Sequence, residues 1–189
     1  VYLTPSGYTG PQPRGGEKGS NALLLDARGR LVLCQHGDRR MAVMDAPLDA
    51  PRPAFTTLAD RWEGLRLNSP NDAVYRSDGA LIFTDPPYGL EGNVDDRFKE
   101  IPFQGVYLLK DGQLRLLTEK LTRPNGLAFL DGEKRLIVAN SDPEKAIWYV
   151  FDIGPGDSLD NARVFYDATP LVGPEHKGLP DGLKVDARG

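Results

Sequence analysis

The sequence predicts an all-β fold, a β-propeller, on the basis of an internal repeat. Four times a Ser or Pro is followed by an Asn or Asp that opens a hairpin pattern, at intervals of 50, 54 and 56 residues. Repeats of about 50 residues are typical of propeller blades, each of which is a small antiparallel sheet. The four segments are Ser20-Asn21-Ala22-Leu23, Pro70-Asn71-Asp72-Ala73, Pro124-Asn125-Gly126-Leu127 and Pro180-Asp181-Gly182-Leu183.

Hydrophobic patterning divides each repeat into four strands. In the second repeat, residues 71–76 alternate as a strand does, Asp78-Gly79 is a hairpin turn signal, and residues 80–85 return. Residues 105–109 and 114–117 then supply the third and fourth strands of the blade. The long loop before the third strand is of a kind that is often functional.

The first and third repeats follow the same pattern, and no segment shows a sustained helical period. We expect strands at residues 22–25, 31–34, 41–44 and 55–58 of the first repeat, and at 127–130, 136–139, 147–151 and 163–166 of the third. The predicted organisation is a loop or the remnant of a preceding blade at 1–20, blades at 21–60, 71–119 and 125–168, and the start of a further blade at 181–189.

Length and composition narrow the classes of protein. A propeller closes with about four to eight blades, so we expect the 189 residues to be about three and a half blades of a longer chain. The 23 basic and 27 acidic residues are interspersed, which argues against a nucleic-acid surface, and no apolar run is long enough to cross a membrane. One cysteine and two histidines exclude Cys-rich zinc sites and disfavour His-rich ones. The sequence does not indicate the oligomeric state. It leaves the compartment open between the cytoplasm, the periplasm and the outside of the cell.

The repeat geometry brings short polar side chains together. The first strand of each blade lines the central channel of a propeller, so Asn21, Asn71, Asn125 and Asp181 should ring one mouth of it. Each predicted hairpin ends 14 or 15 residues after its opening Asn, with its tight turn midway, so both ends lie at the same rim. The residues that end the hairpins, expected just outside the ring, are His36, Asp85 and Asn140.

Two interpretations of the ring remain open on spacing alone. Amide and carboxylate oxygens suit a hard divalent cation such as Ca²⁺. Pro-Asn and Pro-Asp pairs are also ordinary turn signals, in which the Asn or Asp bonds its own backbone. A metal site at Asn71, Asn125 and Asp181 would carry one formal negative charge, so we expect a further carboxylate from another blade.

Several segments together resemble the gluconolactonase, regucalcin and luciferin-regenerating-enzyme family. The resemblance covers nearly the whole chain from about Pro5, and the residues 34–40 are similar to the bacterial gluconolactonase branch. The remaining resembling segments are Leu67-Asn68-Ser69-Pro70-Asn71-Asp72, Phe83-Thr84-Asp85-Pro86-Pro87-Tyr88-Gly89, Arg123-Pro124-Asn125-Gly126-Leu127 and Leu179-Pro180-Asp181-Gly182-Leu183.

The resemblance implies a six-bladed propeller that hydrolyses a sugar lactone to its aldonic acid with one divalent metal in the channel. Calcium is the usual metal, and zinc or manganese can substitute. The family's metal ligands match Asn71, Asn125 and Asp181, and Asp181 would also accept a proton from the attacking water. The family's Glu ligand in a Glu-Gly-Pro motif has no match here, and Glu17 is not a convincing substitute.

Other polar residues are candidates for binding the lactone. Asp72 resembles a family position that contacts substrate hydroxyls, and Asp85, His36 and Asn140 are candidates for hydroxyl contacts or proton relay. Two alternatives are kept because a fold does not fix a substrate. One is an arylesterase or another lactonase on the same fold, and the other is a non-catalytic calcium-binding propeller.

Overall fold

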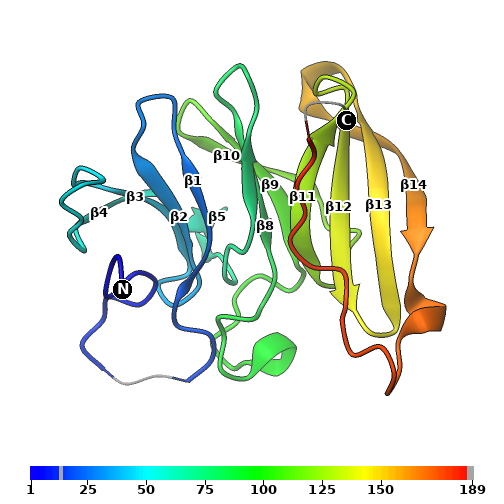
Figure 1. The fold of residues 1–189 in the computed structure, drawn as a ribbon, viewed down its shortest axis with the longest axis horizontal. Helices are drawn as coiled ribbons and strands as arrows, with labels where there is room; N and C mark the ends of the chain where they lie inside the picture. The colour runs from blue at the N-terminus through cyan, green and yellow to red at the C-terminus, as the bar shows by residue number, and fades with distance from the viewer. Residues whose placement is uncertain (13–14, 187–189) are drawn as a thin grey trace.

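Three antiparallel four-stranded sheets follow one another in a computed structural model that describes residues 1–12 and 15–186 (Figure 1). The first sheet contains β1 (Ser20–Leu25), β2 (Leu31–Gln35), β3 (Arg40–Met44) and β4 (Phe55–Ala59). The second contains β7 (Ala73–Tyr75), β8 (Leu81–Asp85), β9 (Gly105–Lys110) and β10 (Gln113–Thr118). The third contains β11 (Pro124–Leu130), β12 (Arg135–Asp142), β13 (Lys145–Ile153) and β14 (Leu159–Asp167).

The arrangement of the sheets confirms the predicted propeller architecture. In every sheet the strands lie in chain order, so each repeat forms one blade. The first strands of the three blades are neighbours, because β7 contacts both β1 and β11. Helical structure in the described residues consists of three single 3₁₀ turns, at Asn93–Asp95, Pro155–Asp157 and Thr169–Leu171. The described residues contain no helix that is long and apolar enough to span a membrane.

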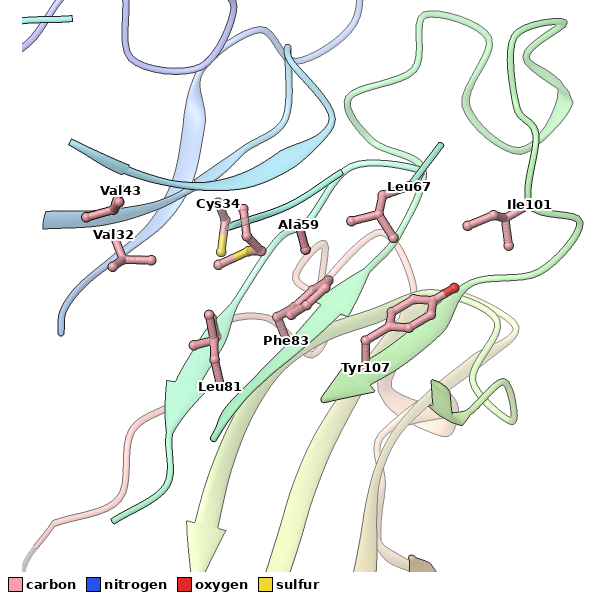
Figure 2. Close-up of a cluster of buried hydrophobic side chains, with 11 residues drawn as sticks. Val32, Cys34, Val43, Ala59, Leu67, Leu81, Phe83, Ile101 and Tyr107 are labelled. Atoms are coloured by element: carbon pink, nitrogen blue, oxygen red, sulfur yellow. The ribbon is translucent and has the colours of Figure 1, made fainter. Parts of the chain in front are cut away.

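Strand periodicity explains how each blade faces two hydrophobic cores. Side chains alternate between the faces of a strand, so Leu81 and Phe83 of β8 enter the core shared with the first blade, whereas Ile82 enters the core shared with the third. Figure 2 shows the first of these cores, where the rings of Phe83 and Tyr107 stack with centroids 5.6 Å apart. A strand buried on both faces is a nearly continuous apolar run, as in β2, where Leu31 to Cys34 are apolar and all five residues are buried.

A glycine closes the turn between the first two strands of the second blade. Gly79 adopts φ 87°, a left-handed conformation that other residues rarely take. The backbone of Arg76 donates its N–H to the carbonyl of Ala80 and closes the hairpin. Gly29 has the same role in the first blade, with φ 74°. The predicted turns Ala27-Arg28-Gly29 and Asp78-Gly79 are therefore confirmed, and each needs a glycine because the turn requires a positive φ.

The structure differs from the sequence-based expectation in two segments. A small two-stranded sheet, β5 (Arg61–Trp62) and β6 (Leu65–Arg66), was not predicted between the first two blades. Residues 181–186 contain no strand, and residues 187–189 of the predicted fourth blade lie outside the described residues. Leu183 and Val185 pack against the face of the third blade that points away from the second blade, where the chain runs beside β11 (Figure 1).

Candidate functional site

The two ends of each inner hairpin meet at one rim, as the spacing predicts. In the second blade, Asn71 donates its backbone N–H to the carbonyl of Thr84 at 2.9 Å, and Thr84 donates to the carbonyl of Asp72 at 3.0 Å. In the third blade, Pro124 lies opposite Asn140 in the strand register. The Asn-containing segments therefore lie at the same end of their blades.

Hydrogen bonds join these segments from one blade to the next. Ala22 of the first blade donates its N–H to the carbonyl of Asn71 at 2.9 Å. The hydroxyl of Thr84 in the second blade donates to the carbonyl of Asn125 in the third at 2.8 Å. These two bonds, one from a backbone N–H and one from a Thr hydroxyl, fix the positions of the motif segments relative to each other.

A glycine lets the last two segments approach each other. A Cβ atom on Gly126 would lie 2.4 Å from the carbonyl oxygen of Asp181 and 2.8 Å from the Cα atom of Gly182. The backbone beside Asn125 therefore lies directly against the backbone of Asp181. A side chain at position 126 would separate them.

We expect Gly126→Ala to lower the free energy of unfolding by about 1–3 kcal/mol, because the clash is with backbone atoms that cannot rotate away. Gly19→Ala is the matched control, since nothing lies within 4 Å of a Cβ atom there. Urea denaturation of both variants measures the difference. Equal stability of the two variants would contradict the close approach.

Asn71 is buried and offers a free oxygen. Its side chain is only 2% exposed, and its Oδ1 atom has no hydrogen-bond partner among the described residues. Its Nδ2 atom lies 3.3 Å from Nε2 of His36, and Nδ1 of His36 lies 3.0 Å from Oε2 of Glu17. Burial lowers the pKa of His36 to about 4, which keeps the imidazole neutral near pH 7.

Asp181 lies near Glu17 and Tyr88. Its side chain is exposed, and Oδ1 accepts the N–H of Gly182 at 2.9 Å. Burial raises the pKa of Glu17, and the charge of Asp181 raises it further. The same two causes raise the pKa of the Tyr88 phenol, although other neighbours, among them Asn125, oppose them. Asp181 and Asn125 therefore belong to one electrostatic neighbourhood with Tyr88.

Asp85 and Asn140 are buried, and their side chains turn to the backbone of their own blades. Both are 0% exposed. The carboxylate of Asp85 accepts the backbone N–H groups of Asn68 and Ser69 at 2.8 and 2.7 Å. Asn140 accepts the N–H of Arg123 at 2.8 Å in the equivalent place of the next blade. Both side chains hold the segment that precedes a motif Asn, and the sequence pattern fixes their position but not the direction in which they point.

Burial gives Asp85 a pKa of about 7, although the two N–H groups that it accepts oppose the shift. The folded protein therefore holds a proton on Asp85 between about pH 4 and pH 7 that the unfolded chain has released. This contribution to stability is complete below pH 4 and is lost as the pH rises to about 7, by up to about 1.4 kcal/mol per pH unit.

We expect Asp85→Asn to remove this pH dependence. Urea denaturation of the native protein and the variant at a series of pH values between 4 and 8 gives the difference in their free energies of unfolding. A difference that stays constant with pH would contradict the shifted pKa.

Asp72 is engaged in joining blades. Its Oδ1 accepts the N–H of Ala73 at 2.9 Å, and its Oδ2 accepts the N–H of Leu127 in the third blade at 3.2 Å. Nζ of Lys184 lies 3.6 Å from Oδ2 of Asp72 and forms an ion pair with it. Contact of Asp72 with a substrate stays a prediction. Its carboxylate would have to bind the substrate in addition to the two backbone N–H groups that it already accepts.

The donor set fits a hard cation. Within residues 1–12 and 15–186, no three side chains of His, Cys, Asp or Glu form a group that could hold a metal ion. The predicted set does not need such a group, since Asn71 and Asn125 are amides. The partnerless, buried Oδ1 of Asn71 is the observation that fits a cation, because most buried carbonyl oxygens have a donor. Oδ1 of Asn68 is also without one among the described residues.

Sequence reasoning missed two members of the site. It set Glu17 aside as a ligand, yet Glu17 contacts His36. It assigned no role to Tyr88, yet the buried Tyr88 phenol lies in the electrostatic neighbourhood of Asp181 and Asn125. A signal for Tyr88 was its place in the long loop directly after β8. Glu17 had no signal, because it precedes the first blade in a segment without strand pattern.

Comparison with known proteins gives the family. The model of the SMP-30/Gluconolactonase/LRE-like region matches residues 9–189. The gluconolactonase of Zymomonas mobilis is 35% identical over 198 residues, which take in all of this chain and 53% of that protein. The structure of a gluconolactonase from Xanthomonas campestris is similar with a TM-score of 0.72 and 34% identity, over 89% of this chain and 53% of that one.

A more distant structure shows the shared fold. The calcium-binding protein regucalcin from Agrobacterium tumefaciens is similar with a TM-score of 0.57 at 18% identity, over 82% of this chain and 47% of that one. The chain spans about half the length of the relatives that it matches. The match of the family model over residues 9–189 shows that the chain belongs to the SMP-30/Gluconolactonase/LRE-like family.

Proposed function

We propose that the protein hydrolyses a sugar lactone to the aldonic acid and needs one divalent metal ion, with calcium as the first candidate and zinc or manganese as the others. The observation that carries the proposal is the buried Oδ1 of Asn71, which has no hydrogen-bond partner among the described residues. The 35% identity of this chain to a gluconolactonase supports the choice of substrate. Asn71, Asn125 and Asp181 would hold the metal. When bound, such an ion polarises a carbonyl and acidifies water.

Asp181 has the chemistry to take the proton of the attacking water. Its carboxylate is exposed and accepts one short-range bond from Gly182, so lone pairs remain for a metal and for a proton. A carboxylate at this place acts as a general base, since ester hydrolysis requires water to lose a proton as it attacks. The backbone contact with Gly126 keeps Asp181 beside Asn125.

We propose Tyr88 as a further contact of the lactone. Its phenol is raised in pKa by burial, so it stays protonated near pH 7 and can donate a hydrogen bond. No partner meets hydrogen-bond geometry at its hydroxyl among the described residues, but the side chains of Ser141 and Asn125 lie close enough to lower its pKa. A sugar oxygen would therefore compete with these two groups for the hydroxyl. Hydroxyl contacts of Asp72, Asp85, His36 and Asn140 stay predictions, and those of Asp85 and Asn140 would require buried side chains to turn.

The test is the hydrolysis of glucono-δ-lactone by the full-length protein after divalent ions are removed with a chelator. The rate without protein is subtracted, because the lactone also opens spontaneously. We expect the catalysed rate to vanish with the chelator and to return when calcium is added. A rate that the chelator leaves unchanged would contradict the metal requirement.

The same assay separates the alternatives. A higher kcat/KM for phenyl acetate than for the sugar lactone would favour an arylesterase. Calcium binding without turnover of either substrate would favour a non-catalytic binding protein. The relative kcat/KM values for the two substrates therefore identify the substrate class. The fold does not, because proteins with different substrates can share it.

A further inference from the structure

The residue that ends the inner hairpin behaves differently in the first blade. Asp85 and Asn140 turn to the backbone of their own blade, each binding the N–H group two residues before the motif Asn. His36 occupies the equivalent position in the first blade. Its contact with the segment before Asn21 is made by its backbone N–H, which donates to the carbonyl of Gly19. Its ring instead reaches Asn71 of the next blade.

The contacts of His36 fix which ring nitrogen carries the proton. Oε2 of Glu17 accepts hydrogen bonds and does not donate them when ionised, so the neutral imidazole carries its proton on Nδ1, 3.0 Å away. Nε2 is then an acceptor, and it faces the donor Nδ2 of Asn71 at 3.3 Å. A ring with its proton on Nε2 would instead favour the opposite orientation of the amide.

Glu17 is held in place by its backbone. Its N–H donates to the carbonyl of Tyr88 at 3.2 Å. The preceding Gly16 lies against the same loop, since a Cβ atom there would lie 3.1 Å from the carbonyl oxygen of Gly89. Glu17 therefore presents its carboxylate to His36 from a fixed backbone, although its side chain is 62% exposed.

We propose that Glu17 and His36 are positioning residues that orient the amide of Asn71, with Nδ2 held by the imidazole and Oδ1 left free for the cation. This inference rests on the proposed metal site. The Asn71 amide can turn either Oδ1 or Nδ2 toward a cation, and the Nδ2 group, which carries hydrogens, repels it. Contacts that hold Oδ1 toward the cation therefore raise the metal affinity. The chain of contacts runs through two blades and the segment that precedes them.

The first test is the tautomer of His36 in the metal-free full-length protein. Long-range ¹H–¹⁵N NMR correlations distinguish a proton on Nδ1 from one on Nε2. We expect the proton on Nδ1 in the native protein and a shift toward Nε2 in Glu17→Ala. A proton on Nε2 in the native protein would overturn the inference.

The second test is calcium affinity by titration calorimetry. Loss of such a supporting contact costs about 10–100-fold in metal affinity, so we expect about tenfold weaker binding for Glu17→Ala and up to 100-fold for His36→Ala. His36→Gln restores part of the affinity because its amide oxygen lies where Nε2 was. Glu144→Ala and His176→Ala, at exposed positions, are the controls.

The outcomes separate this inference from the proposed function. Glu17→Ala is expected to fold normally because its side chain is exposed, so the test stands even if His36→Ala unfolds. Native calcium affinity in Glu17→Ala, with lactone hydrolysis intact, would overturn the inference and leave the function standing. A native protein that binds none of calcium, zinc and manganese would overturn both.

Discussion

Replacing Asp181 with Asn is expected to lower kcat/KM for glucono-δ-lactone by about 10²–10⁴-fold, the usual loss when a general base is removed. Asn is nearly isosteric with Asp and keeps one oxygen, so the variant retains part of its metal affinity. It loses the negative charge that attracts the cation and the basic site for the proton. The fold should be undisturbed, since the Asp181 side chain is exposed and accepts one local hydrogen bond.

The matched control is Asp49→Asn, which makes the same chemical change at an exposed position in the loop between β3 and β4. Rates are measured at saturating calcium, and circular dichroism verifies that both variants fold. Near-native kcat/KM in Asp181→Asn with metal bound would remove Asp181 from the mechanism. In that case the proton would have to go to another base.

Replacing Asp85 with Ala is expected to lower the free energy of unfolding by roughly 2–6 kcal/mol. The substitution leaves the N–H groups of Asn68 and Ser69 buried without an acceptor, and each such group costs about 1–3 kcal/mol. These N–H groups belong to the segment that carries Asn71, so calcium affinity should fall as well. Urea denaturation measures the first effect and calorimetry the second.

Asp26→Ala is the control for this prediction. Asp26 also accepts two backbone N–H groups, from Arg28 and Arg30, but in a turn at the edge of the protein, where it also pairs with the Arg30 guanidinium. Water replaces the lost acceptor there, so we expect a loss of only about 0.5–1.5 kcal/mol. Similar losses in both variants would mean that the burial of Asp85 is not what makes its bonds important.

The blades were predictable because their signals are local. The alternation of Leu81, Ile82 and Phe83 between two cores needs no knowledge of distant residues, since the strand itself imposes the period. Gly79 and Gly29 mark turns for a reason that acts within four residues. The place of each motif Asn at one rim follows from the hairpin length in the same way.

The directions of the rim side chains were not predictable. Asp85 and His36 hold the same place in their blades, but one turns to its own backbone and the other to Asn71 of the next blade. The choice depends on neighbours that only the folded chain supplies, such as the segment at Glu17. Residues 181–186 illustrate the same limit, because they run beside β11 but are not paired with a strand in any sheet of the described residues.

The most direct test of the proposed metal site is a crystal structure of the full-length protein soaked with manganese, with data collected for anomalous scattering. Manganese can substitute in an oxygen-ligand site, and its anomalous signal locates it without reference to the protein atoms. We predict one peak that is bounded by the side-chain oxygens of Asn71, Asn125 and Asp181. A peak elsewhere, or no peak at a manganese concentration that supports lactone hydrolysis, would contradict the account.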